Sequence, residues 1–338
     1  MKAFLVPAAS TGIVADVDPP RPGPGQVVVA VSQVGICGTD VSMFNGDETR
    51  IRHARSTHPL RLGHEWNGRV VEIGDEVDAK WLGKRVTGDT MLGCGHCERC
   101  LNGRHYLCEE RYEIGVRRDW PGALAERLLV PASALYELPD SVTDAMGALV
   151  EPGGNAYRSV DAAQVTSDSR LLVLGTGTIG LLCALFAQAR GVEVHVLGRD
   201  PEALNLARSL GVDGAWTAEN LPALRWDAVI EATNASGMPQ FAVDVVEPGR
   251  RVVLVGIADD PSLIDSRILA RKDVTVVGIL GASMGIQVTI DAYASGAVDP
   301  LPLVSRTIGL DELNDVLTGV IPMKTAGAPK VLVDLGRS

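Results

Sequence analysis

The sequence predicts an α/β chain of two domains, one rich in β-strands and the other a parallel, doubly wound sheet. Three observations carry this prediction. Short strands separated by Gly and Pro fill residues 1–152, buried strands alternate with helical runs over 153–281, and a glycine-rich turn joins the first of those buried strands to a helix. At 338 residues the chain also exceeds the usual size of one domain.

The first region shows short-strand patterns. "QVVVAVSQVGI" (26–36) alternates, with Val27, Val29 and Val31 on one side, while "GRVVEIG" (68–74) and "GALAERLLV" (122–130) have the same character. Gly and Pro clusters such as "PPRPGPG" separate these runs. We expect a predominantly antiparallel barrel or sandwich with loops.

The second region alternates strands and helices. Strand "RLLVLG" precedes helix "LLCALFAQAR", strand "VEVHVLG" precedes helix "PEALNLARSLG", and "DAVIEAT", "RVVLVGI" and "VTVVGIL" follow as buried strands. This order predicts a parallel sheet. The C-terminal stretch reads helix, loop, helix, strand and most simply completes the first domain. The expected domains are therefore 1–152 with 282–338, and 153–281.

Composition excludes several classes of partner. Lys and Arg total 31 against 42 Asp and Glu, a net charge of −11, and no basic run suited to nucleic acid is present. The N-terminal apolar patch is too short for a secretory leader or a membrane span. We therefore expect a cytoplasmic protein that binds neither nucleic acid nor membrane. In a reducing compartment, close-spaced cysteines are expected to bind metal.

Four of the six cysteines lie within one stretch, "GCGHCERCLNGRHYLC" (93–108). Cys94, Cys97, Cys100 and Cys108 supply the four soft ligands that Zn²⁺ takes in a tetrahedral site. Such a site has no open position, so we expect a structural zinc. A redox-active CxxC pair is the alternative interpretation.

The turn "GTGTIG" predicts a dinucleotide site. Gly175 permits the tight turn, Gly177 lets a pyrophosphate approach the backbone, and Gly180 lets the helix pack closely on the strand. Thr178 and Ile179 complete the motif at the helix N-terminus, which favours an anion. A purely structural glycine turn is the alternative.

Residues 198–200 decide which cofactor we expect. NAD enzymes place an acid at the end of the second strand, about 20 residues on, where this chain has Gly198 followed by Arg199. Without the carboxylate a 2′-phosphate is not repelled, and Arg199 can pair with it, so NADP is favoured over NAD. In the competing interpretation Asp200 accepts the ribose hydroxyls and Arg199 is solvated surface.

A second metal site is indicated by "GICGTD", "LGHEWNG" and "LVEPGGN". A catalytic zinc needs about three protein ligands and one open position. Cys37 and His64 with a carboxylate, from Glu65 or Glu151, meet that need. Zinc would ease ionisation of a bound alcohol, and a hydride would then pass to the nicotinamide.

Together these motifs, in this order, resemble the zinc-dependent medium-chain alcohol dehydrogenases over essentially the whole chain. The resemblance implies a GroES-like catalytic domain completed by the C-terminal segment, an inserted Rossmann domain, an active site in the cleft between the two domains, and two zinc ions per chain. It implies that Thr39 passes the substrate proton outward, although Thr39 could simply cap a turn. Glu65 and Glu151 could each be the direct zinc ligand. A dimer or tetramer is expected.

The resemblance also limits the range of substrates that we expect. Glu151 stands at the third ligand position, where the simple alcohol dehydrogenases have Cys. In this the chain is similar to the polyol, sugar and threonine dehydrogenases, which implies oxidation of a secondary alcohol to a ketone. "CGTDVSMFNGD", "GHEWNG" and "VTGDT" resemble aminocyclitol dehydrogenases such as 2-deoxy-scyllo-inosamine dehydrogenase, whereas "EPGGNAY" resembles L-threonine 3-dehydrogenases. Ser42 replaces the relay histidine of many relatives, which leaves water, ribose hydroxyls or a histidine such as His58 for the outer proton path.

Two other classes remain as alternatives. One is a zinc-free reductase that uses NADPH on enones or quinones, and the other is a non-catalytic binding protein on the same scaffold. Neither explains why Cys37, His64 and Glu65 occur together. The metal content separates them, because the dehydrogenase should bind about two zinc ions per chain and either alternative about one.

Overall fold

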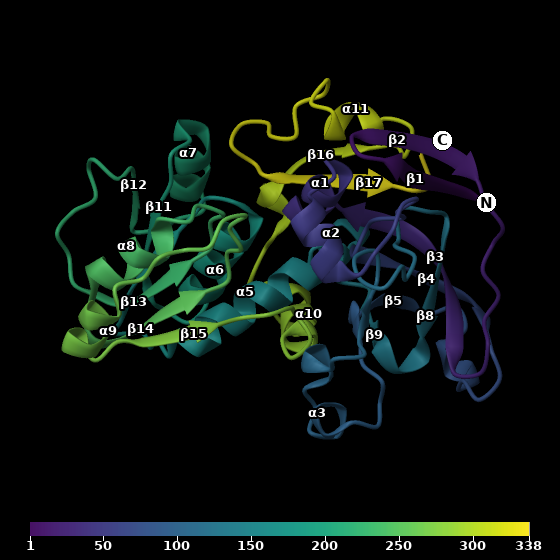
Figure 1. Cartoon of the computed structure of the whole chain (residues 1–338), viewed down its shortest axis with the longest axis horizontal. Coiled ribbons are helices and arrows are strands. Elements are labelled where there is room, and N and C mark those ends of the chain that lie inside the picture. The colour runs from purple at the N-terminus through teal and green to yellow at the C-terminus, as the bar shows by residue number, and fades with distance from the viewer. Residues whose placement is uncertain (338) are drawn as a thin grey trace. The chain divides into compact units, whose positions relative to one another are not determined.

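The computed structural model describes residues 1–337, which form two compact units (Figure 1). Unit 1 comprises Met1–Glu151, Arg306–Met323 and the chain from Lys330 onward. Unit 2 comprises Pro152–Ser305 and Lys324–Pro329. Unit 1 is rich in strands and unit 2 holds a parallel sheet, which confirms the predicted α/β fold class.

The boundary expected at residue 281 differs from the one that contacts define. Residues 282–305 group with unit 2 because helix α10 (Ile286–Ala294) packs closely on the start of helix α5 (Val150–Ala163). A Cβ atom at Gly153 would lie 2.4 Å from the hydroxyl oxygen of Tyr293 and 2.5 Å from Cγ2 of Thr289. The two glycines of "EPGGN" thus allow α5 and α10 to approach each other.

Unit 1 is built on a largely antiparallel sheet in the order β16-β17-β3-β4-β5-β9, with β8 paired to β3. The strands are β3 (Gln26–Gly35), β4 (Glu65–Ile73), β5 (Arg85–Gly88), β8 (Arg127–Pro131), β9 (Leu135–Glu137), β16 (Val304–Ile308) and β17 (Lys330–Asp334). Two-stranded pairs join β1 (Lys2–Ala8) to β2 (Thr11–Asp16) and β6 (Met91–Leu92) to β7 (Tyr112–Glu113).

Short helices connect these strands. The α-helices of unit 1 are α1 (Gly38–Phe44), α2 (Glu48–Ala54), α3 (Glu98–Leu101), α4 (Asp144–Gly147) and α11 (Leu313–Leu317). The 3₁₀ turns of the chain are Ala79–Trp81, His105–Leu107, Ala132–Ala134 and Leu301–Leu303. Strand β16 lies in a stretch that the sequence suggested was a loop.

Strand β3 is the centre of unit 1 and is buried on both faces. Val27, Val28 and Val29 are all fully buried, so the strand does not show the one-sided alternation that the sequence suggested. Its pairing with β4 shifts register between Val28 and Val29, where β4 carries the extra residue Val71, as expected at a β-bulge.

Unit 2 contains a six-stranded parallel sheet in the order β12-β11-β10-β13-β14-β15, the doubly wound order of dinucleotide-binding domains. The strands are β10 (Arg170–Leu174), β11 (Glu193–Leu197), β12 (Gly214–Trp216), β13 (Trp226–Glu231), β14 (Val246–Leu254) and β15 (Thr275–Gly278). The remaining helices are α6 (Thr178–Gln188), α7 (Pro201–Ser209), α8 (Met238–Val245) and α9 (Ser266–Lys272).

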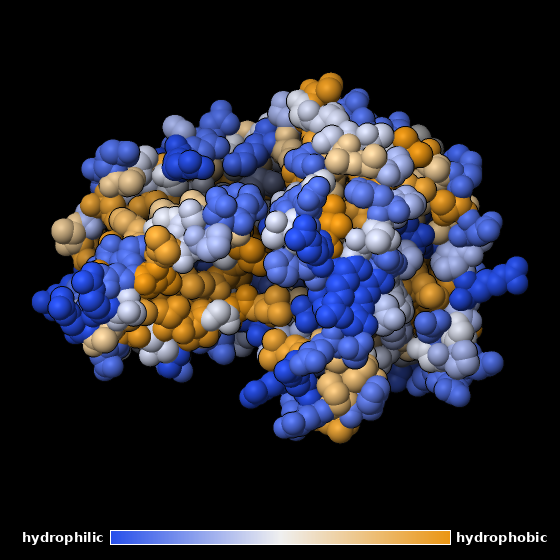
Figure 2. Space-filling view, viewed as in Figure 1, coloured by the Kyte–Doolittle hydropathy of each residue, from blue (hydrophilic) through white to orange (hydrophobic). Residues whose placement is uncertain are grey.

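Strand β15 differs from its prediction as a buried strand. It is the outer strand of the sheet, and Val276 and Val277 are only partly buried. Figure 2 shows hydrophobic side chains gathered at the surface over this side of unit 2. Among the described residues, every helix is too short or too polar to cross a bilayer.

Candidate active site and cofactor site

The end of β3 and the start of β4 bring together three of the predicted metal ligands. Cys37 precedes helix α1, His64 immediately precedes β4, and Glu65 is the first residue of β4, paired with Gly35 of β3. One ligand atom from each of these three side chains lies within 4.8 Å of the others. Because the register of two core strands fixes them, the three ligands are positioned within unit 1.

Asp40 supports this cluster, although sequence reasoning did not single it out. Its Oδ2 accepts a hydrogen bond from the Cys37 backbone N–H at 2.9 Å, and its Oδ1 accepts one from the Gly63 N–H at 3.1 Å. Oδ1 also lies 3.3 Å from Nδ1 of His64. That contact is longer than a well-formed hydrogen bond and acts mainly through charge. It leaves Nε2 of the imidazole available for a metal.

The charges of Asp40 and His64 shift each other's ionisation. Burial is the largest influence on Asp40 and alone would raise its pKa, but attraction to His64 and the hydrogen bonds together hold that pKa below its ordinary value. Burial likewise opposes the charged form of His64, but Asp40 and then Cys37 raise its pKa well above the usual range. A bound cation would replace the imidazole proton in this acidic environment.

Lys330 is the second supporting residue that the sequence did not reveal. It begins β17, and its Nζ lies 2.5 Å from Oε2 of Glu65 and donates to the Ile36 carbonyl at 3.0 Å. Burial alone would lower the pKa of Lys330, but attraction to Glu65 and Cys37 raises it above its usual value. Lys330 therefore stays charged and fixes one oxygen of the Glu65 carboxylate.

Glu151 lies in the first turn of α5 and is buried. Within residues 1–337, the cluster whose ligand atoms lie within 4.8 Å of one another includes Cys37, His64 and Glu65 but not Glu151. Glu65, and not Glu151, therefore lies in this three-residue cluster. One thiolate, one imidazole and one carboxylate form a donor set that fits zinc with an open position.

The candidate proton-relay residues lie on α1 and in the loop that follows α2. Thr39 is in the first turn of α1, directly after the Cys37 turn, and Ser42 lies one turn further along the same helix. His58 is exposed, and its Nδ1 lies 3.0 Å from the backbone carbonyl of Val6.

The four clustered cysteines form a second ligand set. The ligand atoms of Cys94, Cys97, Cys100 and Cys108 all lie within 4.8 Å of one another. The Sγ atoms of Cys94 and Cys100 are 3.9 Å apart and those of Cys97 and Cys108 are 3.8 Å apart. A tetrahedral site with Zn–S bonds of about 2.3 Å has edges of about 3.8 Å, so the cluster fits a structural zinc site.

Backbone hydrogen bonds favour a thiolate at Cys94, whereas burial raises the pKa of Cys100 to about 12. The N–H groups of His96 and Cys97 lower the pKa of Cys94 to about 6. The lobe is also tied to the sheet region, because Nε2 of His105 lies 2.7 Å from a carboxylate oxygen of the buried Asp89.

The glycine-rich turn has the geometry that a pyrophosphate site needs. Gly175 follows β10 with φ of +112°, and Gly177 is the N-cap of α6, with no atom within 4 Å of where its Cβ would lie. A Cβ at Gly180 would lie 2.1 Å from the Gly175 carbonyl oxygen. Thr178 and Ile179 form the first turn of α6. The backbone is therefore open to an anion at the helix N-terminus.

The structure explains why the residue after β11 is Gly198 and not the acid that NAD enzymes place there. A Cβ at Gly198 would lie 2.6 Å from Cγ2 of Thr176, so any side chain there would displace Thr176. Arg199 is exposed. Asp200 is the N-cap of α7, and its side chain accepts a hydrogen bond from the Glu202 N–H at 3.0 Å.

Comparison with known proteins agrees with both units. Residues 23–140 match the family described as alcohol dehydrogenase GroES-like domain, and residues 178–295 match the zinc-binding dehydrogenase family. The chain is 31% identical to the L-threonine 3-dehydrogenase of Rhizobium etli (strain CIAT 652) over 349 residues, covering 99% of this chain and 98% of that protein.

Solved structures show the same relationship. A zinc-binding dehydrogenase from Sinorhizobium meliloti 1021, bound to NADP, superposes with a TM-score of 0.89 at 30% identity and 98% coverage of both chains. An alcohol dehydrogenase from E. coli CFT073, in complex with NADH, superposes with a TM-score of 0.90 at 26% identity and 99% coverage of both. These matches span both units, so the chain is an alcohol dehydrogenase and belongs to the zinc-dependent medium-chain alcohol dehydrogenase family.

Proposed function

We propose that this dehydrogenase oxidises a secondary alcohol of a polyol, sugar or aminocyclitol to a ketone, with two zinc ions per chain and NADP as the preferred hydride acceptor. The observation that carries the proposal is the cluster of Cys37, His64 and Glu65, together with the open glycine turn of the same chain. When bound, zinc makes a substrate hydroxyl more acidic, and the nicotinamide accepts the hydride.

The chain's own residues have separate tasks in this reaction. Cys37, His64 and Glu65 hold the metal, and Asp40 orients the imidazole of His64 through its Nδ1 side. Lys330 engages Oε2 of Glu65, which leaves the other carboxylate oxygen for the ion. Glu151 acts from the first turn of α5 through water.

The proton leaves along α1. Oγ1 of Thr39 accepts the proton of the substrate hydroxyl, because Thr39 lies two residues after Cys37 in the first turn of that helix. Ser42 has no group that titrates near neutral pH, so water or the ribose hydroxyls carry the proton onward. His58 is not used, since it is exposed and bonded to the Val6 carbonyl.

Three features support NADP. Gly198 has no carboxylate that could repel a 2′-phosphate, and there is no room for a larger side chain at this position. Arg199, the next residue, is exposed. Asp200 already caps α7, which argues against its use as the ribose acceptor. The similar zinc-binding dehydrogenase of Sinorhizobium meliloti is bound to NADP, whereas the E. coli neighbour holds NADH.

L-Threonine is the second candidate substrate. The observation that favours it is the 31% identity to L-threonine 3-dehydrogenase over nearly the full length of both chains. Threonine also carries a secondary hydroxyl, so the same residues would act on it. The two proposals differ only in the groups that surround the reacting carbon.

One experiment tests the function and separates the substrates. The purified protein is analysed for zinc and assayed with polyols, sugars, cyclitols and L-threonine, each with NAD and with NADP. We expect about two zinc ions per chain and oxidation of one of these alcohol classes. Cys37→Ser should lose one zinc and the activity, whereas Cys183→Ser, at a buried thiol outside both clusters, should keep both. Undiminished turnover by Cys37→Ser would contradict the proposal.

We also infer a homo-oligomer and a reducing location. The open edge of β15, with Val276 and Val277 partly exposed, supports pairing with a second copy. Val277→Lys should then shift the sedimentation coefficient toward that of a monomer. None of the six cysteines forms a disulfide, which is consistent with the cytoplasm.

A further inference from the structure

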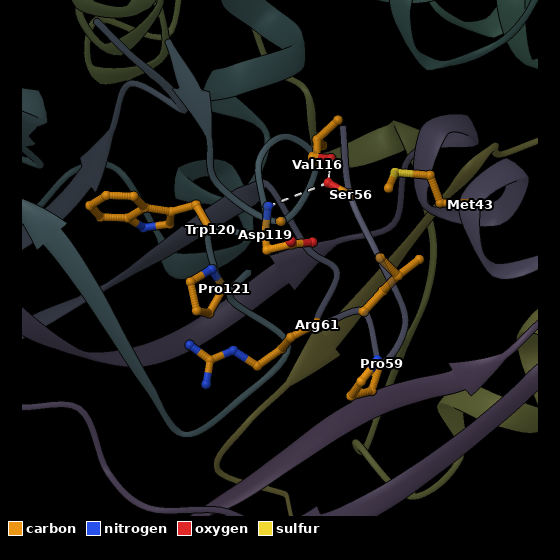
Figure 3. Close-up of a pocket in the computed structure, with 10 residues that line it drawn as sticks. Met43, Ser56, Pro59, Arg61, Val116, Asp119, Trp120 and Pro121 are labelled. Atoms are coloured by element: carbon orange, nitrogen blue, oxygen red, sulfur yellow. Dashed lines mark hydrogen bonds between the residues drawn. The ribbon is translucent and has the colours of Figure 1, made fainter. Parts of the chain in front are cut away.

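Unit 1 contains a cavity for which the proposed reaction has no use. It is a partly open cavity of about 90 Å³, formed by Met43 of α1, the loop that precedes β4, and the loop around Trp120 (Figure 3). In Figure 3 the Arg61 side chain lies on the same side of the cavity as Trp120 and Pro121, and Met43 lies on the other. A cavity of this size is too small for a drug-sized ligand but has room for a small ion.

Among the described residues that line this cavity, Arg61 is the only cation, and none of the others pairs with it. Its Nε is buried without a hydrogen bond, and no acceptor or carboxylate among residues 1–337 pairs with its guanidinium. Burial lowers the pKa of Arg61 to about 10, so the side chain remains charged at neutral pH. Arg61 is partly exposed, but the buried, unpaired part of its guanidinium would be stabilised by a counter-charge from a ligand.

The other polar groups of the cavity already have partners. Oγ of Ser56 donates to the Val116 carbonyl at 2.8 Å. The two carboxylate oxygens of Asp119 accept from the N–H and the hydroxyl of Thr57, at 2.7 and 3.2 Å. Asp119 is thus held by the loop and forms no ion pair with Arg61. The remaining walls are mainly apolar, including Pro59, Leu60 and Trp120.

Arginines are concentrated in the chain around the cavity, in a protein whose net charge is −11. Residues 50–61 contain four arginines and no acid, and residues 109–119 contain three arginines and four acids, one of which is Asp119 of the cavity wall. After burial, repulsion from Arg111, Arg55 and Arg118 lowers the pKa of Arg117, which shows that these cations lie near one another. Repulsion among these cations favours the binding of an anion near them.

We propose that this cavity is a binding site for a small oxyanion, a carboxylate or a phosphate, held by the guanidinium of Arg61. The planar guanidinium presents paired N–H donors that match two oxygens of either group. The ligand is either a free ion or the anionic group of a larger metabolite. Anion binding at this site requires neither zinc nor the dinucleotide, so it can be tested independently of the proposed function.

Calorimetric titration of the purified full-length protein with inorganic phosphate, sulfate and acetate tests the proposal. We expect saturable binding of at least one of these ions, and a melting temperature that rises with its concentration. Arg61→Met should weaken that binding at least tenfold. Arg55→Met, which removes an exposed cation from the same segment, should leave it within about twofold. Should Arg61→Met fail to fold, Arg61→Lys keeps the charge without the paired donors and should bind several-fold more weakly.

Steady-state kinetics distinguish the two sources of the anion. If the group belongs to the substrate, phosphate should compete with an anionic alcohol, and Arg61→Met should raise KM for that alcohol while KM for a neutral polyol stays unchanged. If the ligand is a free ion, phosphate should bind in the calorimeter without competing with any substrate. The proposal is overturned if none of the three ions binds saturably, or if Arg61→Met and wild type bind them equally.

Discussion

Nζ of Lys330 and Oε2 of Glu65 lie 2.5 Å apart, in two side chains that are each about 2% exposed and are separated by 265 positions in the sequence. A buried ion pair stabilises a fold mainly because removing one partner leaves the other charge uncompensated. The pair therefore joins the C-terminal strand β17 to the first residue of β4 at the candidate metal site.

We predict that Lys330→Met lowers the free energy of unfolding of the chelator-treated protein by about 3–5 kcal/mol. The loss should be smaller in the zinc-loaded protein, because the metal then compensates the Glu65 carboxylate. Urea-induced unfolding with and without zinc measures both quantities.

The control for this prediction is Lys84→Met. Lys84 forms an ion pair of similar length, 2.6 Å, with Glu137, but both side chains are about half exposed. Exposed pairs contribute up to about 1 kcal/mol. Equal losses in the two variants would show that the buried pair has no special role.

A second prediction concerns Asp40, whose two oxygens face the Cys37 N–H and, on the other side, the Gly63 N–H and His64. Asn keeps only one acceptor oxygen, so Asp40→Asn must turn an NH₂ group toward one of these donors. We expect zinc affinity at the catalytic site to fall about 10- to 100-fold, with kcat falling as zinc is lost. Competition with a fluorescent zinc chelator measures the affinity.

Asp47→Asn is the matched control for Asp40→Asn. Asp47 caps α2, where its side chain accepts a hydrogen bond from the Arg50 N–H at 3.0 Å. Asn caps helices about as well as Asp, so this variant should keep the stability and zinc affinity of wild type. If Asp40→Asn also behaves like wild type, Asp40 does not position His64.

The sequence predicted those features whose signal is local. The GTGTIG turn lies where a strand meets a helix, and the spacing of Cys94, Cys97 and Cys100 is itself the signature of a metal lobe. The parallel sheet was also predictable, because its buried strands alternate with helical runs. Strand β15 was misjudged because an outer strand and an inner strand can have the same apolar run.

Residues that act through distant contacts could not be predicted in this way. Lys330 looks like an ordinary strand lysine until β17 is placed beside β3, which brings it to Glu65. Asp40 carried a weak signal, since an acid three residues after a helix start often caps the helix, but its contact with His64 depends on how β4 begins. Position 198 is glycine because Thr176, 22 positions earlier, occupies the space that a side chain there would need.

A third prediction tests cofactor choice. Arg199→Ala should raise the Kd of NADP about tenfold or more, because a charge-assisted bond to the 2′-phosphate is lost, and should leave the Kd of NAD nearly unchanged. Arg271→Ala, at an exposed arginine on α9, should change neither constant. Fluorescence titration with the reduced cofactors measures both. Equal effects of Arg199→Ala on the two cofactors would argue against the pairing.

A related prediction uses the contact between Gly198 and Thr176. Gly198→Asp alone should bind both cofactors poorly, because its Cβ would lie 2.6 Å from Cγ2 and 2.9 Å from Oγ1 of Thr176. Adding Thr176→Ala removes both of those atoms. The double variant should therefore bind NAD better than Gly198→Asp does, and binding as weak as that of the single variant would show that the contact is not the obstacle.

The last prediction concerns metal removal and thiol reactivity. Cys183 is fully buried, and burial raises its pKa to about 12, so it should not react with iodoacetamide at pH 8. The other five cysteines, six less Cys183, belong to the two candidate zinc clusters and should be protected while metal is bound. After chelation, mass spectrometry should show these five cysteines labelled and Cys183 unlabelled.

The control variant Cys183→Ser should give the same pattern of five labels. Labelling of Cys94, Cys97, Cys100 and Cys108 at the same rate with and without chelator would mean that their lobe holds no ion, because a thiolate bound to zinc reacts more slowly than a free one.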